Sequence, residues 1–511
     1  MNKKYIKECE STCEYTLPDY LGDVKKILCV KASVIPSGKF STDGEVNFSG
    51  IVAYDVLYSD SEGKLTGLTL NSDYDVSVPV DSESYIDSRA DTSVANLAVR
   101  LTGPRKLSAK ATLSCLARVS SEPQLRCSGE VFSGEFRPEI KEERISIEKS
   151  AFFTSKEREY AEETVRLGGI GADSIEIIAT SGAVRVIEST VENGEVRVRG
   201  EITVTSIIRT DEQPPFAVKK VIPFDESIDL EGMNAEGAFA FADGYLSSVT
   251  AGVSEDAEGA SVNVNVISEL RLAVSKNEEH TVVADAYLKE RDTSVKYEET
   301  EYSSLLCMAG CEEKISCSVS RSEVGIEQVR EVLTMTVDLR QTEKTLTDNG
   351  FTVSGEAIFS GVACEDSSDG EINYAPIKFT SPFKLNVSCN MPMPPDAEIE
   401  LNISAKDVES IIDAEKITAN CHMSVAYRVT KSGVIKRAVE CNLSGEAEYT
   451  ERPSRISVYM PCEGESLFDI AKKFHTTGIK IAEDNELSDA VLSEMGAPVS
   501  NCGVKKLIIR R

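Results

Sequence analysis

The feature that most constrains this chain is a strand-like pattern with a glycine on its apolar face, which occurs three times. In EVRVRGEITVTSI, apolar and polar residues alternate, and Gly200 takes a position where a packed side chain is expected. The runs EVNFSGIVAYDVLY and FTVSGEAIFSGVA place Gly50 and Gly355 in the same setting, 150 residues before and 155 residues after Gly200. Glycine inside a strand usually marks a bulge, a bend or a close backbone approach. We therefore predict a folding role for it.

Two further markers keep the same order around each glycine. The runs AKATLSCLARV, VNVNVISELRLAV and ITANCHMSVAYRV alternate and end 155 residues apart, at Val119, Val274 and Val429. Between each glycine and its valine comes a run led by an aromatic residue: SDYDVSVPV, IPFDESIDL or SPFKLNVSC. Three markers in constant order indicate an internal repeat of domain size.

The residue pattern within each copy is typical of β-strands. The period is two, β-branched residues are common, and turn signals such as SEGK, ENGE and SSDG separate the runs. We predict a mainly β protein with three repeated antiparallel, sandwich-like domains over residues 1–135, 136–290 and 291–450. The charged segment 137–164 reads as edge strands, short helices or connectors, with a solvated charged face as the default interpretation.

Residues 455–511 differ from the repeats. A short alternating strand with Ile456 and Val458 precedes the turn CEGES. A helix follows with its apolar stripe at Leu467, Ile470, Ala471 and Phe474, capped by Glu465 or Ser466. A second helix over 479–485 and a closing strand KKLIIRR complete a small βααβ domain.

Charge narrows the classes of partner. The 85 acidic and 55 basic side chains give a net charge of −30, which repels nucleic acid and acidic lipid headgroups. The N-terminus lacks the apolar run of a secretory signal, and no window approaches the roughly 18 apolar residues of a membrane helix. We expect no nucleic-acid binding, no membrane insertion and a cytosolic location.

Candidate chemical groups are sparse. Cysteines inside strand-like runs, such as Cys115, Cys389 and Cys421, indicate buried reduced thiols. The denser groups, Cys9 with Cys13 and Cys307, Cys311 and Cys317, have spacings that do not match the usual zinc pairs, and oxidative cross-linking is an alternative for them. The three histidines, His280, His422 and His475, read as structural. No nucleophile elbow, phosphate-binding loop or HExxH motif occurs. We expect no metal site, no cofactor and no enzymatic activity.

The C-terminal segment and the repeats each resemble a known family. GESLFDIAKKF, IKIAEDNEL and the terminal LII resemble a LysM module. YTLPDYLGDVKKILCVKASV followed by VNFSGIVAYDVLYSDSEGKL resembles the SPOCS domain of bacterial spore-coat proteins. Several SPOCS copies followed by one LysM module is the layout of the SipL-type spore morphogenetic proteins of clostridial endospore formers.

That resemblance implies a structural adaptor. Such a protein is made in the mother-cell cytoplasm and tethers the assembling spore coat to the forespore surface. Its LysM module is implied to dock on a coat basement-layer ATPase, with other coat proteins as further partners. The alternative function is binding of peptidoglycan, an N-acetylglucosamine polymer of the cell wall or spore cortex.

The LysM resemblance also implies where contacts lie. The glycan groove of the family is formed by two loops, here 463–467 and 486–503. Exposed residues of these loops are expected to contact the partner or the glycan. Phe468 lies off the apolar stripe of the helix, so it is either an exposed anchor for a partner or packs at the edge of the module's own core. The candidate partner- or glycan-binding residues are Glu463, Gly464, Glu465, Ser466, Leu467, Phe468, Asn485, Glu486 and Leu487.

Overall fold

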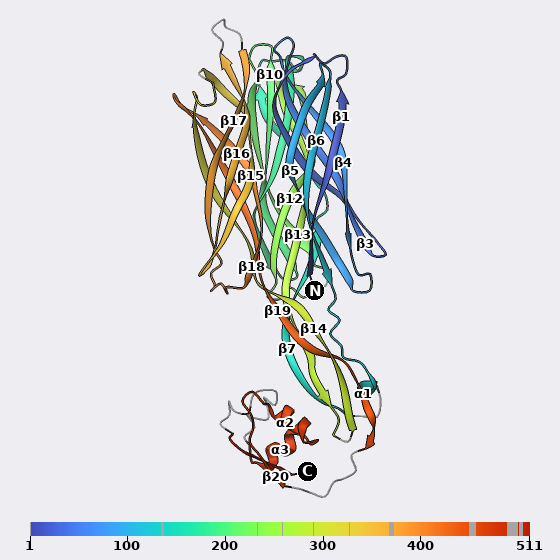
Figure 1. The fold of residues 1–511 in the computed structure, drawn as a ribbon. Coiled ribbons are helices and arrows are strands. Elements are labelled where there is room, and N and C mark those ends of the chain that lie inside the picture. The colour runs from blue at the N-terminus through green and yellow to red at the C-terminus, as the bar shows by residue number, and fades with distance from the viewer. Residues whose placement is uncertain are drawn as a thin grey trace.

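The chain is mainly β, with 76% of residues in strands, several small antiparallel sheets and few helices. The computed structural model describes residues 2–133, 137–231, 233–257, 259–289, 291–326, 328–366, 372–448, 456–487, 499 and 504–510. Figure 1 shows a tall body of long strands, a narrow extension below it and a small helical module at its lower end.

Residues 2–121 form a sandwich of two three-stranded sheets. One sheet has the order β2-β3-β4 and the other has the order β1-β6-β5. The alternating residues that face inward from both sheets form one buried cluster that includes Val46, Tyr54 and Leu113. The strands are β1 (Asn2–Thr16), β2 (Val24–Thr42), β3 (Glu45–Asp60), β4 (Leu65–Pro79), β5 (Tyr85–Gly103) and β6 (Lys106–Ser121).

A second sandwich has sheets β11-β10-β9 and β12-β13-β7, and β8 also pairs with β13. Of the three alternatives for the charged segment 137–164, the structure has edge strands: β7 pairs with the second half of β13 and β8 with the first half. The strands are β7 (Glu139–Thr154), β8 (Arg158–Leu167), β9 (Ile175–Glu192), β10 (Glu195–Thr210), β11 (Phe216–Asp229), β12 (Phe239–Asp256) and β13 (Gly259–Tyr287), with a short 3-10 turn η1 (Ala172–Ser174) before β9.

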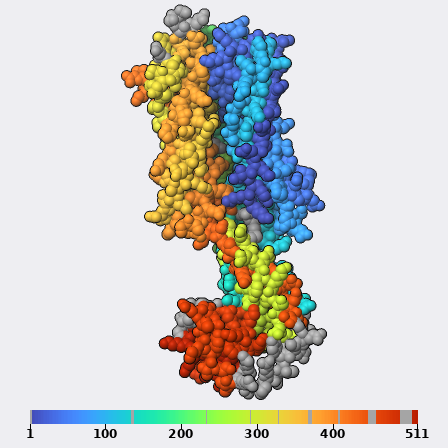
Figure 2. Space-filling model, in the orientation of Figure 1, coloured from blue at the N-terminus to red at the C-terminus, as the bar shows by residue number. Residues whose placement is uncertain are grey.

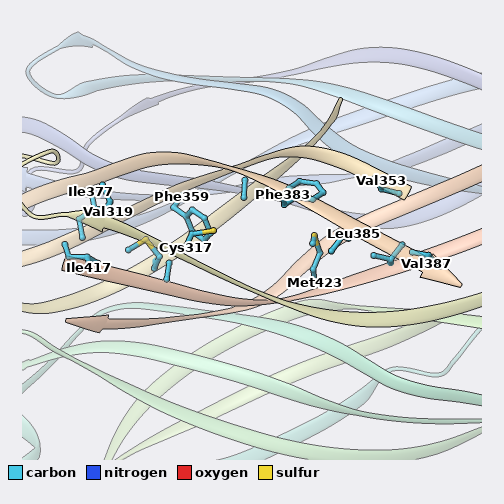
Figure 3. Close-up of a cluster of buried hydrophobic side chains, with 14 of the residues drawn as sticks. Cys317, Val319, Val353, Phe359, Ile377, Phe383, Leu385, Val387, Ile417 and Met423 are labelled. Atoms are coloured by element: carbon cyan, nitrogen blue, oxygen red, sulfur yellow. The ribbon is translucent and has the colours of Figure 1, made fainter. Parts of the chain in front are cut away.

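A third sandwich has sheets β15-β16-β17 and β14-β19-β18. Its core lies between them, with Phe359 and Phe383 from one sheet facing Ile417 and Met423 from the other (Figure 3). The strands are β14 (Arg291–Ser320), β15 (Val329–Thr347), β16 (Gly350–Asp366), β17 (Ile372–Ser388), β18 (Ala397–Ile412) and β19 (Lys416–Glu448).

The structure shows why each of the three repeated strands carries a glycine at this position. In the strand before each glycine, one extra residue bulges out of the ladder directly beside it: Ser37, Ile187 or Thr342. In the strand after it, the ring of Tyr74, Phe224 or Phe383 lies over the glycine. A Cβ there would come within 3.0 Å of both that ring and a backbone oxygen of the bulged strand. Of the alternatives of a bulge, a bend and a close backbone approach, the structure shows a bulge and a close approach at all three glycines.

The three sandwiches pack against one another through matching positions. Leu28, Ile178 and Leu333 lie 22 residues before the three glycines, and they meet in one buried cluster. Leu57, Ile207 and Val362 lie seven residues after the glycines and join the same cluster. The three sandwiches therefore meet at this cluster, and Figure 2 shows the first and third lying side by side in the body.

Two strands run well beyond the ends that the sequence indicates. The apolar alternation stops at Val274 and Val429, but β13 continues to Tyr287 and β19 to Glu448. These extensions pair with β7 and with the first half of β14. We call residues 139–150, 275–287, 291–305 and 430–448 the stalk. Its own clusters hold it together, one around Ile145, Ile147, Val282 and Ile435.

The segment after the first sandwich also attaches to the stalk. Ser128 bridges to Glu440 of β19, and α1 (Glu130–Ser133) follows. Val131 is fully buried in a cluster with Ala286, Leu288 and Cys441. The first 133 residues thus contribute to a sandwich and to the stalk.

The C-terminal module has the predicted order of strand, helix, helix and strand. Its elements are β20 (Ile456–Tyr459), α2 (Leu467–Lys473), α3 (Gly478–Asp484) and β21 (Leu507–Arg510), with β20 and β21 paired antiparallel. Leu467, Ile470 and Ala471 of the predicted stripe are buried in its core. Ser466 caps α2 through a capping box with Asp469, as one of the two predicted caps.

Candidate binding surfaces

The first loop of the C-terminal module contributes fewer exposed side chains than the sequence indicates. Ser466 is 1% exposed because its hydroxyl accepts from the backbone N–H of Asp469, at 3.2 Å, to begin α2. Leu467 is equally buried and lies in the core. The expectation that Ser466 is an exposed contact residue is therefore wrong. Glu463 and Gly464 are exposed.

Phe468 is buried as well, and its partner belongs to another part of the chain. It is 6% exposed, and its ring packs edge-on against Tyr287 of the stalk with 5.1 Å between centroids. The interpretation of Phe468 as an exposed anchor for a partner is wrong. Of the two interpretations of this residue, packing is correct, and the surface it packs on is the end of β13.

The remaining candidate residues divide between structural and exposed positions. Glu465 is half-buried, and its carboxylate accepts from the Tyr459 hydroxyl at 2.8 Å. Asn485 donates to the Ile508 carbonyl at 2.7 Å and so ties the end of α3 to β21. Leu487 packs on the core, whereas Glu486 is exposed. Most of the second loop, 488–498 and 500–503, lies outside the described residues.

An exposed apolar surface lies on the β20–β21 ribbon of the same module. Ile456 is 69% exposed, Val458 67%, Met460 73% and Ile508 40%. Val458 pairs directly with Ile508, so these side chains share the outer face of the β20–β21 ribbon. We call these four residues the apolar strip. Its signal in the sequence is the run ISVYM, in which Ile456, Val458 and Met460 alternate while Tyr459 faces the core.

The module is fastened to the stalk by polar contacts as well as by rings. The hydroxyl of Tyr287 donates to the backbone oxygen of Thr476 at 2.7 Å, and Lys472 pairs with Asp285 at 2.6 Å. Burial, with the nearby carboxylates of Glu139 and Asp285, raises the pKa of Tyr287, so the hydroxyl stays protonated and keeps donating. The contacts fix the module relative to the stalk.

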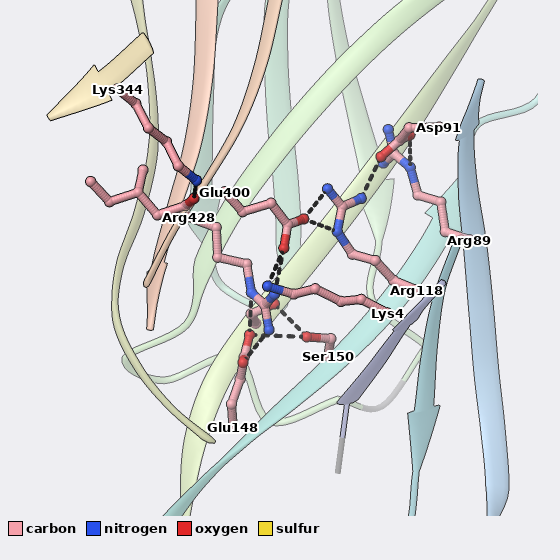
Figure 4. A network of polar contacts seen from close by, with 11 residues as sticks. Lys4, Arg89, Asp91, Arg118, Glu148, Ser150, Lys344, Glu400 and Arg428 are labelled. Atoms are coloured by element: carbon pink, nitrogen blue, oxygen red, sulfur yellow. Dashed lines mark hydrogen bonds and ion pairs between the residues drawn. The ribbon is translucent and has the colours of Figure 1, made fainter. Parts of the chain in front are cut away.

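The body holds a buried network of charges where the three sandwiches meet (Figure 4). Arg118 of β6 pairs with Asp91 of β5 and with Glu400 of β18. Arg428 of β19 pairs with Glu148 of β7, which is 2% exposed, and with Glu400 at 3.2 Å. The network therefore links residues from all three sandwiches.

The charged state of this network is set by its arginines. Burial raises the pKa of Glu400, but Arg118, Lys4 and Arg428 outweigh burial and hold that pKa below its usual value. The pKa of Asp91 is also lowered, because Arg89 and Arg118 outweigh its burial. Since every carboxylate here is matched by guanidinium groups, the arrangement is that of a structural tie between domains.

The described residues assemble no recognisable catalytic or metal centre. His280, His422 and His475 lie in β13, in β19 and just after α2, and within this part of the chain no three His, Cys, Asp or Glu residues are grouped to hold a metal ion. No helix among the described residues is long and apolar enough to cross a membrane. What the geometry does offer is surfaces and cavities between β domains.

Fold and surfaces together define an elongated β protein with a small helical module at one end. Comparison with protein families adds a more specific finding: residues 174–254 match the family model described as SipL, SPOCS domain. The match runs from the end of η1 through β9, β10, β11 and β12 and includes Gly200. This part of the chain is a SipL SPOCS domain, and the match points to a protein of the spore coat. No curated protein and no solved structure matches the chain.

Proposed function

We propose that this chain is a non-enzymatic adaptor of endospore envelope assembly, which tethers coat layers to the forespore surface from the mother-cell side. The SPOCS match over residues 174–254 carries this proposal. The recurrence of one strand order supports reading residues 1–135, 136–290 and 291–450 as three SPOCS-like copies. In the first and third copies, six strands form two three-stranded sheets, and the strand with the repeated glycine is the middle strand of one of them. In the second copy, β7 and β8 both pair with β13 and together take the place of one strand.

The C-terminal module, residues 455–511, is proposed to resemble LysM and to supply the docking site. Its βααβ order supports the resemblance. The proposed partner is a coat basement-layer ATPase, bound through the apolar strip, with the exposed loop residues Glu463, Gly464 and Glu486 as further candidate contacts. Exposed apolar side chains grouped on one face are typical of protein-binding surfaces. Peptidoglycan remains the alternative ligand, since the second loop of the family's glycan groove lies largely outside the described residues.

Purified full-length chain and purified basement-layer ATPase test the proposal by co-precipitation. The double variant Ile456→Ser/Val458→Ser changes only exposed side chains of β20 and is expected to lose the ATPase. The matched control is Val221→Ser, an exposed valine of β11 at 44% exposure, which is expected to retain it. Unchanged capture by the β20 double variant would exclude the apolar strip as the docking surface.

Sedimentation with insoluble peptidoglycan separates the alternative function. Retention of the full chain on peptidoglycan without any protein partner would favour the glycan-binding function over the adaptor. Fluorescent fusions of the full chain and of the β20 double variant in sporulating cells give the cellular readout. A signal around the forespore for the full chain and a diffuse signal for the variant are expected.

A further inference from the structure

Two thiols from opposite sheets of the third sandwich meet near the point where the stalk joins the body. Cys307 lies in β14, just beyond the stalk segment 291–305, and Cys389 directly follows β17. Both are half-buried free thiols, and both pack against the buried core of this sandwich. The pair therefore lies inside the sandwich without being fully shielded from solvent.

The register of the strands directs both side chains into the sandwich. Cys307 lies opposite Val429 of β19, which is fully buried in the core, and directly opposite residues of paired strands share a face. Val387 of β17 points inward with 6% exposure, and Cys389, two residues later, points the same way. The N–H of Cys389 donates to the Asn349 backbone oxygen at 2.9 Å, so the ladder between β16 and β17 extends to this residue.

The two sulfur atoms are in contact. The Cys307 thiol donates a hydrogen bond to Cys389 Sγ, and the Tyr427 hydroxyl donates to the same sulfur. The ring of Tyr427 is held by an edge-on contact with Phe351, with 5.3 Å between centroids. Sulfur atoms in hydrogen-bond contact need a shift of about 2 Å or less to reach the length of a disulfide bond. The two sheets are thus already close enough to be joined through these side chains.

The hydrogen bonds make the two thiols unequal. The bonds that Cys389 accepts from Cys307 and Tyr427 favour its thiolate and oppose the effect of burial on its pKa. The bond that Cys307 donates adds to burial and raises the pKa of Cys307 to about 12. Because the thiolate is the nucleophile, Cys389 is the thiol that reacts first with an oxidant.

The fold does not require thiols at these two positions. Val80 and Leu230 take the place of Cys389 in the first and second sandwiches, and their N–H groups make the matching backbone hydrogen bond. Opposite the valine that ends the apolar alternation, the second sandwich has Ala151 where the third has Cys307. Since apolar side chains serve for packing here, packing alone does not explain why two thiols face each other.

We propose that Cys307 and Cys389 are a site of disulfide formation, which joins the two sheets of the third sandwich where the stalk leaves the body. The oxidant is a peroxide. The Cys389 thiolate attacks one peroxide oxygen and becomes a sulfenic acid, and the other oxygen leaves as hydroxide and takes up a proton to form water. The Cys307 sulfur then attacks the sulfenic sulfur, which forms the S–S bond and releases a second water. Two thiols and one hydrogen peroxide thus give one disulfide and two waters.

The bond closes a loop of about 80 residues, and disulfides that close loops of this length stabilise the folded chain mainly by constraining the unfolded one. Because β14 continues from Cys307 into the stalk, the bond also ties the base of the stalk to the second sheet of the sandwich. This inference is independent of the adaptor function.

Treatment of the reduced full chain with about one molar equivalent of hydrogen peroxide tests the proposal. Peptide mapping without reductant is expected to find Cys307 linked to Cys389, with fragmentation of the linked peptides to assign the two sulfurs. Calorimetry is expected to show the melting temperature of the third sandwich rising by about 5 °C or more. Dithiothreitol should reverse both changes.

Cys311 provides the matched control, because it lies four residues further along β14 and packs on the same core. Cys311→Ser is expected to keep the linked peptide and the rise in melting temperature, whereas Cys307→Ser and Cys389→Ser are expected to lose both. Each variant is compared with its own reduced form, so any stability lost through the substitution itself cancels. Absence of the linked peptide from the treated native chain, linkage of Cys311 in place of Cys307, or a rise in melting temperature retained by Cys389→Ser would each overturn the proposal.

Discussion

Replacing Gly200 with alanine tests the structural explanation of the repeated strand. The new Cβ would lie less than 3.0 Å from the Arg185 backbone oxygen and from two ring atoms of Phe224. The ring can shift, but the oxygen belongs to the backbone of β9, whose pairing with β10 would have to distort. Overpacking of this kind costs about 1–3 kcal/mol. Alanine also reduces the entropy of the unfolded chain, which returns about 0.4–1 kcal/mol. We expect a net loss of about 1–2 kcal/mol.

The matched control is Gly252→Ala in β12 of the same sandwich, where no atom lies within 4 Å of the added Cβ. It is expected to be neutral or slightly stabilising, because only the entropy contribution applies. For a domain of this size a loss of 1–2 kcal/mol lowers the melting temperature by about 2–8 °C. Calorimetry of the full chain measures the shift, and hydrogen exchange over β9, β10 and β11 locates it. Equal shifts for both variants would refute the steric explanation.

Three further outcomes are expected. Tyr287→Ala removes a ring and a hydrogen bond from the junction of stalk and module, so small-angle scattering should show a mobile module and protease should cleave the variant faster than the native chain. Tyr287→Phe keeps the ring, so its module should stay docked, with a loss of about 1 kcal/mol in the free energy of unfolding. An alanine variant as compact as the native chain would contradict this. Glu148→Gln removes one of the two carboxylates paired with buried Arg428 and leaves Glu400, which should cost about 1–3 kcal/mol in denaturant unfolding, and an unchanged free energy of unfolding would contradict it. Burial and a neighbouring thiol raise the pKa of Cys307 to about 12, so its thiolate fraction and its alkylation rate at pH 8 should be low and should rise with pH. The exposed Cys462 should react before it, and mass spectrometry after iodoacetamide treatment gives the order of reaction. Equal alkylation rates for the two cysteines would contradict this.

The sequence was sufficient to predict strands, their alternation and the glycine bulges, because these depend on residues close together along the chain. The stalk was not predictable in the same way. Beyond Val274 the sequence is SKNEEHTVV, which is too polar to predict a strand. This segment is a strand because it pairs with β7, which lies more than a hundred residues earlier. Glu148, one of the two carboxylates paired with Arg428, lies 280 residues away, so the burial of this pair has no local signal either.

The candidate site shows the same division. The cap at Ser466 and the apolar stripe of α2 follow from local spacing, and both agree with the structure. The burial of Phe468 depends on Tyr287, which lies 181 residues earlier and carries no mark of its role in its own strand. The apolar strip was readable from the alternation in ISVYM, provided that the face turned toward Tyr459 is taken as the inner one.

The stalk has a mechanical consequence. Residues 276–287 of β13 span about 40 Å at the usual rise per residue, and paired β-strands resist bending and stretching far better than a flexible linker does. Because its far end is fixed to the helical module, the stalk acts as a spacer of constant length. It sets the distance between a partner bound to the body and a partner bound to the C-terminal module. Deleting two residues from each of its four strands would preserve the inside–outside alternation and shorten that distance by about 7 Å.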